Sequence, residues 1–232
     1  MLKTISLSFA ALFFVCLLGC HPSSNSNYQN KEFEGIIKYK TKYYSWQDSS
    51  KGDFVHDTLT IYYSHGNLAK IHTDAAMHKE IFLSKGNKYF YIRSNIDTLF
   101  WFDITTNPKM ELSDMQVKNY DKTILGHKCE SVDLLIKHPD KDLPFYTTVS
   151  YIFSRNNLRV EKANLNWNKY AFFDKFIDES GCFYLGYKYA AHSTTGFKVL
   201  LSTEYEAISI KEQKVDPKVF ELDKFPLKEL KL

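Results

Sequence analysis

The chain has 232 residues, of which 44% are hydrophobic and 25% are charged, which is typical of a globular protein with a sizeable core. Lys and Arg number 30 against 27 Asp and Glu, and no basic cluster of the kind that follows a phosphate backbone occurs, so nucleic acid is not an expected partner. Beyond residue 20 no apolar run approaches the ~18 residues of a transmembrane helix, so none is predicted there.

The amino-terminal segment combines a positive charge, a short apolar run and a cysteine. Lys3 precedes the nearly uncharged stretch Ile5 to Leu18, which is too short to span a bilayer and fits the apolar region of an export signal. The run closes on Leu-Leu-Gly-Cys at positions 17–20, which resembles the lipobox of bacterial lipoproteins. The resemblance implies that residues 1–19 are a signal peptide and that Cys20 is acylated, with palmitate as a typical chain. The alternative is an ordinary secretory signal with a chance cysteine.

Residues 20–31 are predicted to be the acylated cysteine and a flexible tether, because His21 to Lys31 is polar and contains a proline. The residues directly after Cys20 lack the acidic cluster that resembles a surface-export signal in some Gram-negative lineages. They also lack the aspartate that retains lipoproteins at the inner membrane in others. The expected location is therefore the periplasmic face of the outer membrane, with the membrane itself as a partner through the lipid.

From Phe33 to Ser154 the chain is a succession of short β-rich runs separated by turn residues such as Gly66-Asn67 and Gly86-Asn87. This spacing predicts an antiparallel meander. The predicted strands lie within residues 33–46, 57–64, 67–74, 78–84, 88–94, 97–104 and 144–154. In the second of these runs Leu59, Ile61 and Tyr63 share one face, as period-two alternation requires.

Two of these strands, within residues 88–94 and 97–104, carry large apolar side chains on both faces. A sheet with one solvated face would expose some of them, so both faces are expected to be covered by helices, by a second layer or by a cavity that holds a ligand. The candidates for lining such a cavity are Tyr89, Tyr91, Leu99, Trp101, Tyr151 and Phe153.

A helix is predicted over residues 166–180, where Trp167, Tyr170, Phe173 and Ile177 follow helical spacing. Asn164 or Asn166 is the expected N-cap, and Gly181 the expected C-cap. Residues 198–215 then return to strands, and residues 215–222 end the domain with a proline turn.

Three segments resemble parts of known exported proteins of Gram-negative bacteria: FEGIIKYK at residues 33–40, KTILGHKCESV at 122–132 and VDPKVFEL at 215–222. They resemble the GLPGLI-type and related families of unknown function, whose fold is similar to that of the lipoprotein carriers LolA and LolB. The resemblance implies a mainly β, α+β fold: a single domain over residues 32–230 that forms a curved, half-open antiparallel barrel with a helix packed on the sheet. Binding of a lipid-like ligand is implied by analogy with the carriers.

Cys129 and Cys182 are the two cysteines left after cleavage of the signal and acylation of Cys20. An even number in an exported protein favours a disulfide, which would stabilise the fold by about 4 kcal/mol. The alternative is a pair of buried free thiols.

The sequence contains no familiar set of nucleophile, base and orienting group. His72, Asp74 and His78 are close in sequence, but they lack the spacing of a structural metal site; His127, Glu204 and Glu206 fit surface positions. No enzyme activity, metal or cofactor is therefore predicted. The expected function is a binding module for a hydrophobic or lipidic ligand. The alternative is a dry core in a protein that binds an envelope protein through its surface.

Overall fold

The computed structural model describes residues 31–45, 54–73, 77–93, 97–105, 110–138, 145–194, 199–222 and 226–230, without the side chains of 54–57 and 77–78. The predicted signal peptide, Cys20 and nearly all of the predicted tether lie outside the described residues, as does Asp74. Residues Glu32–Leu232 form one compact unit.

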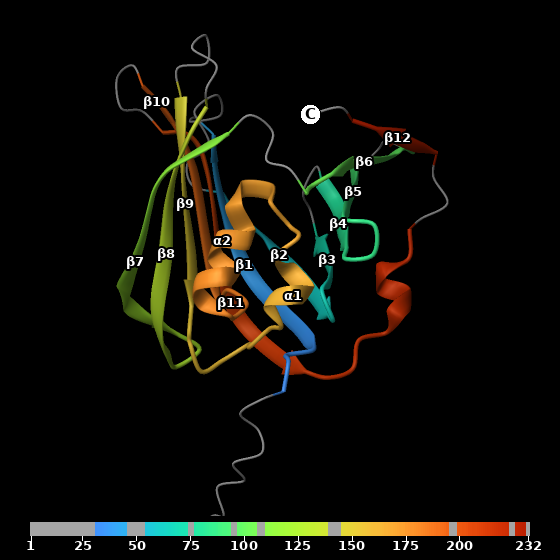
Figure 1. The fold of residues 1–232 in the computed structure, drawn as a ribbon, viewed down its shortest axis with the longest axis horizontal. Coiled ribbons are helices and arrows are strands. Elements are labelled where there is room, and N and C mark those ends of the chain that lie inside the picture. The colour runs from blue at the N-terminus through green and yellow to red at the C-terminus, as the bar shows by residue number, and fades with distance from the viewer. Residues whose placement is uncertain are drawn as a thin grey trace, which may run out of the picture. The chain divides into compact units, whose positions relative to one another are not determined.

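The unit is built on one open, curved sheet of twelve strands in the order β12-β6-β5-β4-β3-β2-β1-β11-β10-β9-β8-β7 (Figure 1). All neighbours are antiparallel except β6 and β12. The predicted mainly β, curved antiparallel fold is therefore confirmed. The strands are β1 (Gly35–Ser45), β2 (Phe54–Ser64), β3 (Asn67–His72), β4 (Met77–Leu83), β5 (Lys88–Arg93), β6 (Leu99–Asp103), β7 (Glu111–Ile124), β8 (His127–Lys137), β9 (Phe145–Phe153), β10 (Gly186–Ser193), β11 (Val199–Glu212) and β12 (Leu227–Glu229).

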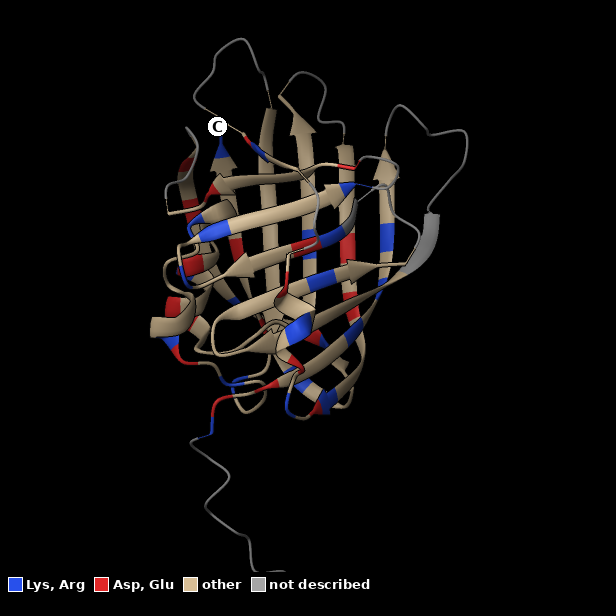
Figure 2. Cartoon of the chain, turned by 90° about the vertical axis from the view of Figure 1, so that its right-hand side faces the viewer, with Lys and Arg blue, Asp and Glu red and all other residues tan. Residues whose placement is uncertain are grey.

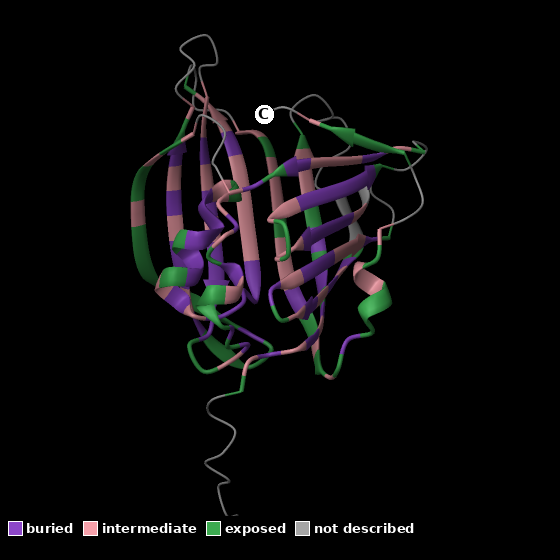
Figure 3. Cartoon of the chain, turned by 45° about the vertical axis from the view of Figure 1, so that its right-hand side comes forward, coloured by how far each residue is buried: buried purple, intermediate pink, exposed green. Residues whose placement is uncertain are grey.

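Alternation along each strand decides which side chains enter the main core. In β2 the side chains of Leu59, Ile61 and Tyr63 are fully buried, whereas Thr60 and Tyr62 between them are half-buried. This confirms the predicted face. The same rule fills the concave side of the sheet with aromatic and aliphatic side chains from ten strands, and the edge strands β7 and β12 are mostly exposed (Figure 3).

The charged residues are distributed singly and with both signs over the strands (Figure 2). Several form exposed ion pairs, such as Lys40 with Glu206 at 2.7 Å and Lys118 with Asp133 at 3.2 Å. Exposed pairs of this kind contribute about 0–1 kcal/mol each, so the fold depends on its core.

The strands β5 and β6 are covered on both faces, as predicted. On the convex side Phe90, Ile92 and Leu99 form a second core with Ala69 and Ile81. A 3-10 turn, η4 (Pro217–Phe220), and the residues after it cover this cluster with Val219, Phe220 and Leu222. The chain then pairs β12 with β6, so the carboxyl-terminal segment acts as a strap across this face.

The predicted helix over residues 166–180 is wrong in its first half. The structure has α1 (Lys162–Leu165), a 3-10 turn η3 (Tyr170–Phe172) and α2 (Phe173–Ser180). Ala171 and Phe172 both have left-handed backbone angles, with φ of 50° and 57°, and this interrupts the helix before Phe173. Neither Asn164 nor Asn166 caps α2, whereas Gly181 ends it in a left-handed conformation as predicted.

The predicted disulfide is also wrong, because Cys129 and Cys182 are free, buried thiols. Val132 pairs with Tyr151, whose ring stacks on α2. Cys129 is three residues from Val132 on the same strand, so it points to the opposite face of the sheet. Cys182 follows Gly181 at the end of α2, and its thiol lies 3.7 Å from the carbonyl oxygen of Arg155.

No helix among the described residues is long and apolar enough to cross a membrane.

The packing of α2 on the sheet gives a stability prediction. Phe176 is fully buried, and its ring stacks on Tyr151 with the centroids 4.5 Å apart. We expect Phe176→Ala to lower the free energy of unfolding by about 3–5 kcal/mol, since it removes a large side chain from a close-packed site. Urea unfolding followed by tryptophan fluorescence measures this loss.

Asp178→Ala is the matched control, because Asp178 is exposed on the same helix. It should change the free energy of unfolding by about 0.5 kcal/mol or less. Equal losses in the two variants would show that α2 does not dock through Phe176.

Candidate functional site

Tyrosine side chains gather on the concave side of the sheet from both of its halves. Tyr151 of β9, Tyr187 of β10 and Tyr205 of β11 lie in one cross-strand row. Their ring centroids are 5.4 and 5.3 Å apart. Tyr189 follows Tyr187 on the same face of β10. Residues on the same face of adjacent strands are in contact, so the strand register alone brings these rings together.

The other half of the sheet contributes Tyr89 and Tyr91 from β5, whose rings are 5.7 Å apart. Tyr170 comes from η3, outside the sheet, and stacks on Tyr89 at 6.1 Å with the planes 11° apart. We call the seven residues together the tyrosine face: Tyr89, Tyr91, Tyr151, Tyr170, Tyr187, Tyr189 and Tyr205.

A buried carboxylate lies among these rings. Glu80 of β4 has one oxygen, Oε1, 2.9 Å from Nε2 of His72. The other, Oε2, accepts a hydrogen bond of 2.9 Å from the Tyr89 hydroxyl and lies 3.8 Å from Nζ of Lys70. Lys70 is directly opposite Glu80 in the pairing of β3 with β4, so neighbouring strands supply all of these contacts. Both carboxylate oxygens are therefore occupied.

These contacts keep Glu80 ionised. Burial alone would raise its pKa, but the charge of Lys70 and the contacts with His72 and Tyr89 outweigh that effect and lower the pKa to about 2. His72 is itself buried, and its Nδ1 lies 3.5 Å from the Tyr43 hydroxyl. Glu80, His72 and Lys70 thus form a compact charged cluster inside the domain.

The charge of Glu80 acts on tyrosines from both halves of the tyrosine face. Burial raises the pKa of Tyr170 to about 12, and the charge of Glu80 contributes to this shift. Burial and the same charge raise the pKa of Tyr187 and of Tyr205 well above the ordinary value of 10.0. These phenols therefore stay protonated at neutral pH, and each can donate one hydrogen bond.

Of the six residues predicted to line a ligand site, the structure places four on the concave side: Tyr89, Tyr91, Tyr151 and Phe153. Leu99 belongs to the convex cluster, with Trp101 packed against it. Phe100 and Phe102 of β6 face the concave side. Leu99 and Trp101 alternate with them along the strand and therefore lie on the convex face. Leu99 and Trp101 therefore do not lie on the concave side with the other four residues.

The sequence interpretation missed Glu80, Lys70, Tyr170, Tyr187 and Tyr205. For Lys70 and Glu80 a signal was present: Lys70 alternates with Leu68, and Glu80 alternates with Phe82, so period two places each of them on an inward face. For Tyr170 the signal was weak, because its position depends on the left-handed angles that follow it.

The other residues considered for catalysis or metal binding do not assemble. His127 and Glu204 are exposed, and Glu206 forms its ion pair with Lys40. The side chain of His78 is not among those that the structure describes. Within the described ranges, no group of three or more His, Cys, Asp or Glu side chains has the arrangement of a metal site.

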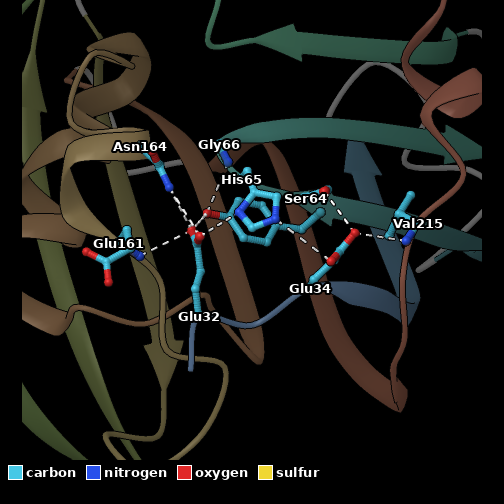
Figure 4. Close-up of polar contacts among 9 residues, drawn as sticks. Glu32, Glu34, Ser64, His65, Gly66, Glu161, Asn164 and Val215 are labelled. Atoms are coloured by element: carbon cyan, nitrogen blue, oxygen red, sulfur yellow. Dashed lines mark hydrogen bonds and ion pairs between the residues drawn. The ribbon is translucent and has the colours of Figure 1, made fainter. Parts of the chain in front are cut away.

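A second polar cluster surrounds Glu32, at the start of the compact unit (Figure 4). Its Oε1 accepts hydrogen bonds from the Tyr63 hydroxyl at 2.6 Å, from Nδ2 of Asn164 at 3.0 Å and from the backbone N–H of Glu161 at 3.3 Å. Its Oε2 lies 3.0 Å from Nδ1 of His65. Burial opposes ionisation, but these contacts together lower the pKa of Glu32.

Glu34 extends this cluster on its other side. It accepts hydrogen bonds of 3.0 Å from the Ser64 hydroxyl and from the backbone N–H of Val215. The two glutamates thereby join the first residues of the unit to the β2–β3 turn, to α1 and to the carboxyl-terminal segment (Figure 4). Both oxygens of Glu32 and Oε1 of Glu34 have protein hydrogen-bond partners, so we assign this cluster a structural role.

Comparisons with known proteins add no assignment: no family model matches the chain, and a search of curated proteins gives no significant match.

The low pKa of Glu80 predicts a pH dependence of stability. Because the pKa in the folded state is about 2, below the ordinary 4.5, the stabilisation is complete above pH 4.5 and is lost as the pH falls from 4.5 towards 2. At roughly 1.36 kcal/mol per pKa unit the contribution is about 3 kcal/mol. We expect Glu80→Gln to be less stable than the wild type at pH 7 and to lose less stability over this acidic range, in urea unfolding at a series of pH values.

Glu206→Gln serves as the control, because Glu206 is a partly exposed member of a surface ion pair. Its acid dependence should match that of the wild type. A Glu80→Gln protein with the same slope as the wild type would contradict the buried, ionised state of Glu80.

Proposed function

We propose that this domain is a non-enzymatic binding module that accepts a hydrophobic or lipidic ligand on the tyrosine face, and that acylated Cys20 holds it at the periplasmic face of the outer membrane. The observation that carries the proposal is the exposure of Tyr170. The residue is 43% exposed although its ring stacks on buried Tyr89. Tyr187, Tyr189 and Tyr205 are also only half-buried. What supports a ligand site is that these partly exposed rings adjoin one another, because contiguous exposed apolar surface is typical of binding sites.

The charged cluster fits binding better than catalysis. A general base near neutral pH needs a pKa close to 7, whereas Glu80 is held ionised with a pKa of about 2. Both of its oxygens and both ring nitrogens of His72 already have protein partners. The cluster therefore fits a fixed set of charges beneath the tyrosine face better than a group that exchanges protons with a substrate.

A second candidate is an envelope protein that acts through its surface. The observation that favours it is β7, an edge strand of 14 residues that is exposed along most of its length. Such an edge offers unpaired backbone groups to a strand of another protein. Ligand binding on the tyrosine face distinguishes the first candidate from the second.

A binding experiment tests the tyrosine face directly. The apolar fluorophore N-phenyl-1-naphthylamine should increase its emission on binding to the wild-type domain. Tyr170→Ala should weaken binding roughly tenfold, which corresponds to ~1.4 kcal/mol. Tyr120→Ala, on β7, is the matched control and should bind as the wild type does. Absence of binding to the wild type, or an equal loss in both variants, would favour the surface candidate.

The membrane anchor has its own test. Cys20→Ala should move the protein from the membrane fraction to the soluble fraction, because the acyl chains contribute ~0.8 kcal/mol for each buried CH₂ group. Cell fractionation followed by immunoblotting measures this. A Cys20→Ala protein that stays with membranes would refute the anchor, and cleavage of the wild type by protease on intact cells would refute the periplasmic orientation.

A further inference from the structure

We infer that the ligand of the tyrosine face is a neutral amphiphile with a hydroxyl-rich head, such as an alkyl glycoside, and not a bare acyl chain. The inference rests on the proposed function and narrows its ligand class. It follows from the free hydroxyl groups of the tyrosine face and from the balance of charge beneath them.

Three of the deeper tyrosines have their hydroxyls bonded within the protein. Tyr39 donates to the carbonyl of Tyr184 at 2.8 Å, Tyr63 donates to Glu32 and Tyr89 donates to Glu80. These three buried hydroxyls are thus satisfied by protein partners.

The tyrosines closer to solvent differ. Among the described residues, no hydrogen bond engages the hydroxyls of Tyr170, Tyr187, Tyr189 or Tyr205. Within the ranges that the structure describes, Oδ1 of Asp174 is the one fully buried side-chain oxygen or nitrogen without a hydrogen-bond partner in a residue that is not itself exposed. The hydroxyl oxygens of Tyr187, Tyr189 and Tyr205 are therefore not fully buried, and Tyr170 is itself an exposed residue. Each can donate one hydrogen bond and accept others.

A ligand that covers the tyrosine face must replace water there. An aliphatic chain would leave the four hydroxyls without partners, and unpaired buried polar groups oppose binding. A hydroxyl-rich head offers both donors and acceptors, which is what a row of neutral phenols can pair with. The flat faces of Tyr187 and Tyr205, stacked at 5.3 Å, supply apolar area for the rest of the molecule.

The charge of the site points to a neutral head. Glu80 is already balanced by Lys70 at 3.8 Å, and the Lys70 ammonium lies over the ring of Phe82 at 5.1 Å. A carboxylate or ammonium on the ligand would lose its hydration without meeting an unbalanced opposite charge among the described residues of the tyrosine face. Hydrogen bonds between neutral groups avoid that cost.

The backbone at η3 is strained in the way that binding sites often are. Ala171 and Phe172 are consecutive non-glycine residues with left-handed angles, and they hold Tyr170 over Tyr89. Tyr170 thus brings a phenol from outside the sheet onto the rings of Tyr89 in β5 and Phe102 in β6.

Competition experiments on the full mature domain test the inference. Bound N-phenyl-1-naphthylamine is displaced with octyl glucoside, octanoate or free glucose, each below any micelle concentration. We expect octyl glucoside to displace the probe at roughly tenfold lower concentration than octanoate. Competition by free glucose as strong as that by octyl glucoside would assign the hydroxyl-rich group to a free sugar, and weaker competition by glucose would assign it to an amphiphile head.

The matched variant replaces three hydroxyls and keeps the rings: Tyr170→Phe, Tyr187→Phe and Tyr205→Phe together. It should bind the probe within about twofold of the wild type but lose the preference for octyl glucoside over octanoate. Tyr120→Phe should keep that preference. Probe binding without any glycoside preference, or a preference that survives in the triple variant, would overturn this inference alone. A wild type that binds no probe would overturn the proposed function as well.

Discussion

A charge that stays ionised inside the domain constrains the arrangement around it. Glu80 keeps its charge because His72, Lys70 and Tyr89 reach it from β3 and β5, on either side of its own strand. A shift of either pairing by one residue would turn these partners to the convex face and leave a carboxylate unpaired among aromatic rings. The cluster therefore fixes the register of β3, β4 and β5, and this register in turn sets the positions of Tyr89 and Tyr91 beneath Tyr170.

Much of the fold could be predicted from alternation, because a curved sheet with one filled face repeats a single rule along every strand. The run at residues 57–64 shows this, since Leu59, Ile61 and Tyr63 are buried as expected. The unbroken apolar run of β5 was equally informative, because it predicted that both faces of the strand are covered. One face packs in the concave core and the other lies under the carboxyl-terminal strap. The strand β7 has no such signal, because an exposed edge strand needs no apolar face.

The parts that could not be predicted depend on geometry that a linear pattern does not contain. Helical spacing over residues 166–180 is real, but two left-handed residues divide the segment, and only tertiary contacts reveal this. An even number of cysteines indicates nothing about which faces of the sheet they occupy. The candidate site was only partly foreseen, because its tyrosines lie far apart in the chain and meet through the strand order β1-β11-β10-β9.

The cluster around Glu32 has a mechanical consequence. A tension applied to the chain at residue 31 would not peel β1 away from the sheet one hydrogen bond at a time. Glu32 would distribute the load at once to the β2–β3 turn through His65 and to α1 through Asn164, and the backbone bond from Phe33 to Arg159, 2.6 Å long, would carry a further share. Contacts loaded in parallel yield at higher force than contacts loaded in series. A domain suspended by its amino terminus from a membrane would thus be held where several segments of the chain are joined.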